Sequence, residues 1–299
     1  MSTLRSTLRH SALLSLLPAL GLLTSCFHAA SEDDALPAGT TRLTLQVVSF
    51  EQIPFDTSSG TRAVALADLA SRLNFILFDG SDKAANIAQT SADDGFGSVS
   101  VAIAPGDYTL VVAAHSQAKN ISASSPTELQ FSNPLTDVFY YSEPISVGDT
   151  PASHAVALSR AVAMFRFNCT DEVPEEVTTM QFKYSGGSLR LNPATGFGTS
   201  ASSQTATFDI DDDMVGLPAT FEVYTFPHQA DDVLTKMTVT ALDAEENVLY
   251  ERTFQNVPIK PNQITVYSGA FFAGSGGNDE DSFTIEADGE WGAQRSFIF

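Results

Sequence analysis

The chain has 299 residues, of which 36 are acidic and 15 are Lys or Arg, so its formal net charge at pH 7 is −21. A charge of this sign and size argues against binding to nucleic acid and against electrostatic docking on an anionic lipid surface. Hydrophobic residues make up 43% of the sequence, which excludes global disorder. The length is sufficient for one large domain or two ordinary ones.

The N-terminal segment has the parts of an export signal. Arg5 and Arg9 precede an uncharged apolar run, residues 12–23, that is too short to stay in a bilayer as a spanning helix. The small side chain of Ser25 then precedes Cys26. This order resembles a bacterial lipoprotein signal, which implies cleavage between Ser25 and Cys26 and acylation of Cys26, with palmitate among the acyl chains. The alternatives are an ordinary signal peptide with a chance cysteine, or a buried N-terminal helix.

Residues 26–39 follow this signal (residues 1–25) as a polar, acidic tether. The run 31–34 resembles the export signal of surface lipoproteins, in which serine and acidic residues follow the acylated cysteine. Alternatively, these acids only solvate a linker. No later apolar run is long enough to span a membrane. The sequence therefore predicts a protein that is held at the outer membrane by lipid and faces the cell surface.

Cys26 and Cys169 are the two cysteines of the chain. If Cys26 carries lipid, Cys169 has no partner for an intrachain disulfide. Cys169 ends a strand-like run, residues 165–169, and is interpreted as a small buried hydrophobic residue rather than a nucleophile.

From residue 41 onward, short segments with apolar residues at every second position predict strands. One exception is the stretch 63–69, which fits a short helix, and another is 115–135, which reads as a long loop. The turn at Pro105-Gly106-Asp107 predicts a hairpin between its two flanking strands. The predicted strands of the first half are 41–47, 73–78, 96–103, 108–114, 139–141 and 145–147.

The second half repeats this pattern after a break near residues 148–151. The break predicts a domain boundary, which divides the chain into residues 40–152 and 153–299. Many short strands at regular spacing are typical of an all-β sandwich, and here of two. The predicted strands of the second half are 155–160, 161–167, 177–184, 189–191, 205–210, 220–226, 235–242, 248–254, 264–272 and 282–286.

Residues that carry chemistry do not form a recognisable constellation. His115, His154 and His228 are isolated, and the sequence has no metal-binding pair of histidines, no nucleophile elbow and no phosphate loop. The sequence therefore predicts no enzyme, no cofactor and no metal site. The acidic run 209–213 is interpreted as a turn, with a weak calcium site as the alternative, because an EF-hand would need Gly and Glu at two later positions that do not have them.

Aromatic residues leave a second question open. The run 139–141 and Trp291 could stack on sugar rings, although core packing is the commoner use of aromatic residues in a sandwich.

Several phrases spread over residues 40–291 together resemble one known family, the fimbrillin superfamily, and in particular its lipidated fimbrial anchor subunits. Each phrase is short, and it is their order along both halves that carries the resemblance. The phrases are residues 73–80, 105–110, 159–167, 173–184, 256–269 and 283–291.

This resemblance implies two tandem transthyretin-like, Greek-key β-sandwiches and a role in cell adhesion. In that family, stalk subunits polymerise by strand exchange after an Arg-specific protease removes the N-terminal strand, whereas anchor subunits keep their lipidated N-terminus at the base of the fibre. Arg42 and Arg62 are the arginines nearest a stalk-type cleavage site. The expected partners are other fimbrial subunits, bound by β-strand addition. The alternative function is a surface glycan-binding lipoprotein of a nutrient-uptake system.

Overall fold

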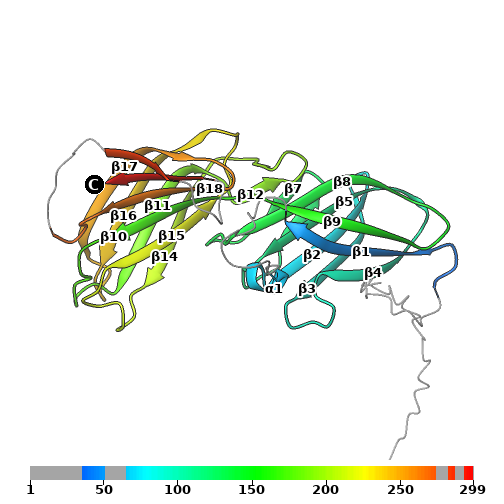
Figure 1. Cartoon of the computed structure of the whole chain (residues 1–299), viewed down its shortest axis with the longest axis horizontal. Coiled ribbons are helices and arrows are strands. Elements are labelled where there is room, and N and C mark those ends of the chain that lie inside the picture. The colour runs from blue at the N-terminus through cyan, green and yellow to red at the C-terminus, as the bar shows by residue number, and fades with distance from the viewer. Residues whose placement is uncertain (1–35, 51–64, 274–281, 287–292, 299) are drawn as a thin grey trace, which may run out of the picture.

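A computed structural model describes residues 36–50, 65–273, 282–286 and 293–298. Within these ranges the regular elements are strands, apart from one short helix, α1 (Leu66–Leu69), so the predicted all-β class is confirmed. Two β-sandwiches lie end to end along the long axis of the molecule, with β7 and β12 between them (Figure 1).

The first sandwich is a seven-stranded sheet that folds over on itself. The fold lies at β8 and β9, which pair only through Phe139 with Arg160 and Tyr140 with Ser159. One layer has the order β3 (Asp82–Thr90), β2 (Arg72–Asp79), β5 (Gly106–His115), β8 (Val138–Val147), and the other has the order β9 (Ala152–Arg160), β1 (Thr41–Phe50), β4 (Ser98–Ile103).

The predicted hairpin at Pro105 is wrong. The strand before this turn, β4, pairs with β1, whereas the strand after it, β5, pairs with β2 and β8. The turn at Pro105 thus carries the chain from one layer to the other. The nearest true hairpin joins β2 to β3, where Gly80 has φ +57°, a left-handed conformation that suits glycine. The sequence did not predict β3, because its Ala, Asn and Gln residues have low strand propensity.

The second sandwich has two separate layers around its own apolar core. The period-two segments of the second half form most of its strands, as predicted. One layer has the order β15 (Ala219–Thr225), β10 (Ala163–Cys169), β18 (Gln263–Gly269), β20 (Ala293–Ile298), β19 (Ser282–Glu286), and the other has the order β14 (Ser202–Asp209), β11 (Thr179–Gly187), β16 (Asp232–Leu242), β17 (Val248–Ile259).

A small sheet joins the two sandwiches. Two of its strands come from the segment 115–135, which the sequence predicts as a loop, and two come from the second half. The segment 115–135 was hard to predict because its strands are only three or four residues long, and one of them consists mostly of serine. The order of this sheet is β13 (Phe197–Gly198), β12 (Arg190–Asn192), β7 (Glu128–Gln130), β6 (Ser122–Ser125).

The predicted boundary between residues 152 and 153 stays a prediction. At this point of the chain β9 begins, and β9 pairs with β1 and β8. Two residues, Ala161 and Val162, then connect β9 to β10 of the second sandwich, and both are buried.

Candidate functional site

Of the N-terminal residues predicted to be lipidated or cleaved, the structure describes only Arg42. Ser25 and Cys26, and also Arg62, lie outside the described residues. Arg42 is the second residue of β1, half-buried and opposite Ala102 of β4. Proteases cut exposed, mobile segments most readily, so cleavage at Arg42 would first require the start of β1 to leave its sheet.

β1 is held on both sides. It runs antiparallel to β4 and parallel to β9, with a bulge between Val47 and Ser49. On its inner face Leu45 is fully buried in the core of the first sandwich, and on its outer face the Thr44 and Ser100 hydroxyls lie 2.9 Å apart. The N-terminal strand is therefore an integral part of the layer, and its removal would open a groove between β4 and β9.

The joint between the sandwiches has a third apolar core. The outward face of the layer containing β2 and β5 meets the outward face of the layer containing β10 and β18, and the small sheet covers the seam. A close approach fixes the geometry, because a Cβ at Gly196 would overlap the Tyr140 hydroxyl of the first sandwich. The core includes Ile76, Val111, Leu129, Met164, Leu191 and Ile264.

A buried arginine links the two sandwiches beside this core. Arg160 Nε donates to both carboxylate oxygens of Asp137, at 2.9 and 3.1 Å, and its Nη1 donates to Asn262 Oδ1 of the second sandwich at 2.9 Å. Its guanidinium lies 4.7 Å from the ring centre of Phe139. Burial raises the pKa of the Asp137 carboxyl, and the charge of Arg160 opposes that rise. One signal in the sequence pointed to this cluster, an arginine within the otherwise apolar run around residue 160.

A second polar group lies under the same joint. His115 is 0% exposed, with Nε2 3.3 Å from Asn74 Oδ1, and its Nδ1 accepts the backbone N–H of Gln117 at 3.2 Å. These contacts fix a neutral ring with the proton on Nε2. Burial lowers the pKa of His115 to about 4, with a smaller contribution from the charge of Arg72. His115 is therefore a structural histidine of the core.

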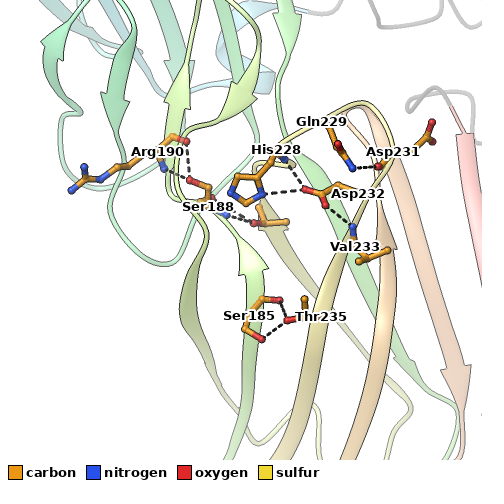
Figure 2. Close-up of polar contacts among 10 residues, drawn as sticks. Ser185, Ser188, Arg190, His228, Gln229, Asp231, Asp232, Val233 and Thr235 are labelled. Atoms are coloured by element: carbon orange, nitrogen blue, oxygen red, sulfur yellow. Dashed lines mark hydrogen bonds and ion pairs between the residues drawn. The ribbon is translucent and has the colours of Figure 1, made fainter.

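Among the described residues, the surroundings of His228 are the most similar to a catalytic triad. Figure 2 shows His228 between Ser188 and Asp232, and its Nδ1 lies 3.1 Å from Asp232 Oδ2. A Ser-His-Asp triad needs the other ring nitrogen to accept the serine proton. Here His228 Nε2 is buried without a hydrogen-bond partner, and the Ser188 hydroxyl donates to Arg190 O at 2.9 Å. Because Ser188 is also 0% exposed, it cannot act as a nucleophile.

The remaining candidates have structural surroundings. His154 Nε2 lies 2.8 Å from the Tyr141 hydroxyl, whose pKa burial raises to about 12 with help from Glu143. Cys169 is buried, and burial raises the pKa of its thiol, as expected for an inert residue. The acidic run that begins at Asp209 forms the turn after β14.

The described part of the chain lacks two other kinds of functional feature. No group of three or more His, Cys, Asp or Glu side chains there could hold a metal ion. No helix there is long and apolar enough to cross a membrane.

The aromatic run 139–141 is mainly structural. Phe139 is buried in the first core, against Phe50 and the Arg160 guanidinium. Tyr140 and Tyr141 are half-buried, and the Tyr141 hydroxyl bonds Glu143 at 2.9 Å. Trp291 lies outside the described residues. The run therefore gives no support for stacking on sugar rings.

Comparison with known sequences gives one family. The model of a family of unknown function, DUF6562, matches residues 115–295, a span that includes the small sheet and the second sandwich. No curated protein matches the chain.

Comparison with solved structures gives distant neighbours. A candidate adhesin of Bacteroides ovatus is 13% identical, with a TM-score of 0.47, and the match covers 73% of this chain and 83% of that one. A candidate polysaccharide-binding protein of Bacteroides thetaiotaomicron is 11% identical, with a TM-score of 0.44 over 73% and 80% of the two chains. The fimbrial anchor protein Mfa2 of Porphyromonas gingivalis is 10% identical, with a TM-score of 0.41 over 71% and 82%. At these TM-scores the likeness carries no argument about function.

Proposed function

Because the chain belongs to the family of unknown function DUF6562, its role has to be inferred from its own residues, and we propose that it is a lipid-anchored structural subunit of a bacterial fimbria. In this role Cys26 carries the lipid, and the tether connects the lipid to the folded part of the chain. The two sandwiches form the base that holds the fibre at the outer membrane. The absence of a catalytic arrangement among the described residues is compatible with a structural protein.

The proposal rests on the position of β1 in the middle of its layer. The strand that follows the tether is paired on both sides, to β4 and to β9, and buries two leucines, Leu43 and Leu45. A lipid at Cys26 would thus be joined to the centre of a layer rather than to a loose end. This is the arrangement that an anchor subunit needs and that a subunit cleaved after Arg62 would lose.

The same layer offers an edge for a neighbouring subunit. β4 is its outer strand, and its outward residues Ser98, Ser100 and Ala102 are small and uncharged. Exposed edges of this kind accept an added strand, whereas charged residues and bulges discourage it. The outer strand of the opposite layer, β3, carries Lys83 and a bulge in its pairing with β2. Strand addition is therefore expected at β4 rather than at β3.

Membrane attachment is tested by the variant Cys26→Ala. Separation of outer membranes from soluble fractions should move this variant out of the membrane fraction while its circular dichroism spectrum stays that of a β protein. Cys169→Ala is the matched control, because it removes the other cysteine and should leave the protein in the membrane. A Cys26→Ala protein that stays firmly in the outer membrane would refute lipid anchoring.

Fibre attachment is tested separately. Deletion of the chain should release assembled fimbriae into the medium, and Ser100→Lys should do the same in part while the protein remains in the membrane. Asn86→Lys, which adds the same charge to β3, is the control and should retain the fibres. If the fibres stay attached after deletion, the proposed fimbrial role is wrong, whatever the result for lipid anchoring.

A further inference from the structure

The outward face of one layer of the second sandwich is hollowed. β14, β11, β16 and β17 form a groove of about 840 Å³ on the side of this layer that faces away from the core. Neutral hydroxyl groups dominate the centre of its floor, and we call it the hydroxyl groove. The hydroxyl side chains that line it are Thr179, Ser185, Ser203, Thr207, Thr238 and Thr240.

Strand periodicity produces this floor. Alternate residues of β11 face the groove, including Gln181 and Lys183, while the residues between them, such as Phe182, lie in the core. The pairing register places Gln181 opposite Thr207 on one side and Thr240 on the other. The groove is therefore lined across three adjacent strands by groups that both donate and accept hydrogen bonds.

Charge is distributed unevenly along the groove. Lys183 is opposite Thr238 and Lys236 is opposite Ser185, so the two lysines are diagonal neighbours, whose backbones in a sheet lie about 7–8 Å apart. Both are exposed, and neither forms an ion pair with a carboxylate in the part of the chain that the structure describes. The groove is also lined by three acidic residues, Asp209, Glu246 and Glu251. Glu251 is opposite Thr240 near the middle of the floor and accepts the Thr240 hydroxyl at 3.5 Å, whereas Asp209 is opposite Thr179 at the end away from the lysines.

This lysine pair stands out against the rest of the molecule. The chain has a formal charge of −21, so its net charge disfavours the approach of anions. Two adjacent ammonium groups beside neutral hydroxyls create one local place where an anionic group is favoured. An anion bound there would receive charge-assisted hydrogen bonds, which are about twice as strong as neutral ones.

We propose that the hydroxyl groove binds an acidic oligosaccharide, with a carboxylate of the sugar between Lys183 and Lys236 and its hydroxyl groups on the threonine and serine side chains. The lining disfavours an apolar peptide, because its aliphatic side chains, Leu242 and Val248, are confined to the far end. Its one aromatic residue, Tyr184, is buried and donates its hydroxyl to Tyr224 O at 3.1 Å. The site goes beyond the structural role proposed above and does not depend on it.

Some of the floor is already ordered before a ligand arrives. The hydroxyls of Ser185 and Thr235 lie 2.8 Å apart (Figure 2), and those of Thr238 and Thr253 lie 3.1 Å apart. These contacts hold the side chains in one geometry, which lowers the entropy that binding would cost. In contrast, Thr207 is exposed, so its hydroxyl is a suitable probe of direct contact with a sugar.

The test is isothermal titration calorimetry of the purified full-length protein with three ligands of similar size. Trigalacturonate, a trisaccharide of a uronic acid, should bind with a saturable isotherm, whereas maltotriose, which is neutral, should bind at least about tenfold more weakly. Triglutamate has a similar charge without sugar hydroxyls and should also bind more weakly. Raising the salt concentration should weaken the binding of trigalacturonate.

Two variants locate the site. The double variant Lys183→Ala/Lys236→Ala should weaken trigalacturonate binding by about tenfold, and Thr207→Val, which keeps the branched shape, by a few-fold. Lys83→Ala/Lys119→Ala removes the same charge elsewhere and should leave the affinity unchanged. The proposal is overturned if trigalacturonate shows no saturable binding, if both double variants behave alike, or if triglutamate binds as tightly as the saccharide. None of these outcomes bears on release from the membrane in the Cys26→Ala variant.

Discussion

The two sandwiches share a fold class but fill their cores with different side chains. The first core is mainly aliphatic, with Leu45, Leu73 and Leu110 fully buried and few aromatic rings. The second contains a connected cluster of rings with neighbouring centres 4.6–6.4 Å apart. Its members include Phe165, Phe167, Phe182, Phe221, Phe254 and Tyr267.

This difference matters because the two kinds of contact restrict geometry differently. Aliphatic contacts are non-directional, whereas edge-to-face ring contacts favour particular orientations and add to the energy of burial. The second sandwich should therefore tolerate substitution least. The stability of the first sandwich should depend more on the pairing of its strands, and above all on β1, because β1 places Leu43 and Leu45 in the core.

The largest effect is expected for Phe167→Ala. The Phe167 ring is fully buried and meets Phe182 edge-on, with ring centres 5.8 Å apart. Removing it should cost about 4 kcal/mol of unfolding free energy, measured by urea denaturation followed by circular dichroism. A loss below about 1 kcal/mol would mean that the ring cluster repacks freely, and the contrast between the cores would disappear.

Leu45→Ala tests the first core and should cost about 3 kcal/mol in the same assay, because Leu45 is fully buried at the centre of β1. The cost should appear together with faster proteolysis near the N-terminus, since β1 becomes easier to release. Leu217→Ser is the control for both core variants: Leu217 is 55% exposed, so the change should stay within about 0.5 kcal/mol.

Arg160→Met asks whether the two cores act together. It leaves Asp137 without its ionic partner at a largely buried site, and should cost about 2–3 kcal/mol. We also expect the single unfolding transition to separate into two. The double variant Arg160→Met/Asp137→Asn should recover part of this loss, because no carboxylate is then left unpaired. The Arg160–Asn262 bond, not the ion pair with Asp137, reaches the second sandwich, so a single unfolding transition in Arg160→Met would show that Arg160 does not couple the sandwiches.

The smallest of the expected effects is a pH dependence from His115. Its pKa is about 4 in the folded protein and about 6.5 in an unfolded chain, so protons bind preferentially to the unfolded state. Stability should therefore fall as the pH drops below about 6.5, by roughly 2 kcal/mol between about pH 7.5 and about pH 5. His115→Gln should flatten this part of the curve. Parallel curves for the variant and the native protein would assign the effect to other groups.

Features of the fold that depend on residues close together in the sequence could be predicted, whereas contacts between distant residues could not. Alternating residues such as Leu43, Leu45 and Val47 gave the strands and their class, because the period of two is a property of the strand itself. The pairing partner of β4 was not predictable from Pro105, because a turn residue fixes a change of direction and not the layer that the chain enters. Contacts such as Arg160 with Asn262 join residues far apart in the sequence and leave no periodic trace.

The candidate sites likewise include one that a linear stretch of sequence predicts and one that only the fold brings together. Cys26 was recognisable because a lipoprotein signal is read as a linear stretch, although it lies outside the described residues. Lys183 and Lys236 were not singled out, because they become neighbours only through the register of β11 with β16. The sequence did not predict that His228 and Ser188 lie near one another, because the fold and not a linear motif brings them together.

The two-sided pairing of β1 has a mechanical consequence. If Cys26 is fixed in a membrane and a fibre pulls on the body of the protein, tension enters through β1 and acts along its hydrogen bonds to β4 and β9 in shear, so that many bonds must break together rather than one at a time. If the neighbouring subunit is bound at the β4 edge, the tension passes from β1 to its direct partner within one layer, and the second sandwich does not bear it.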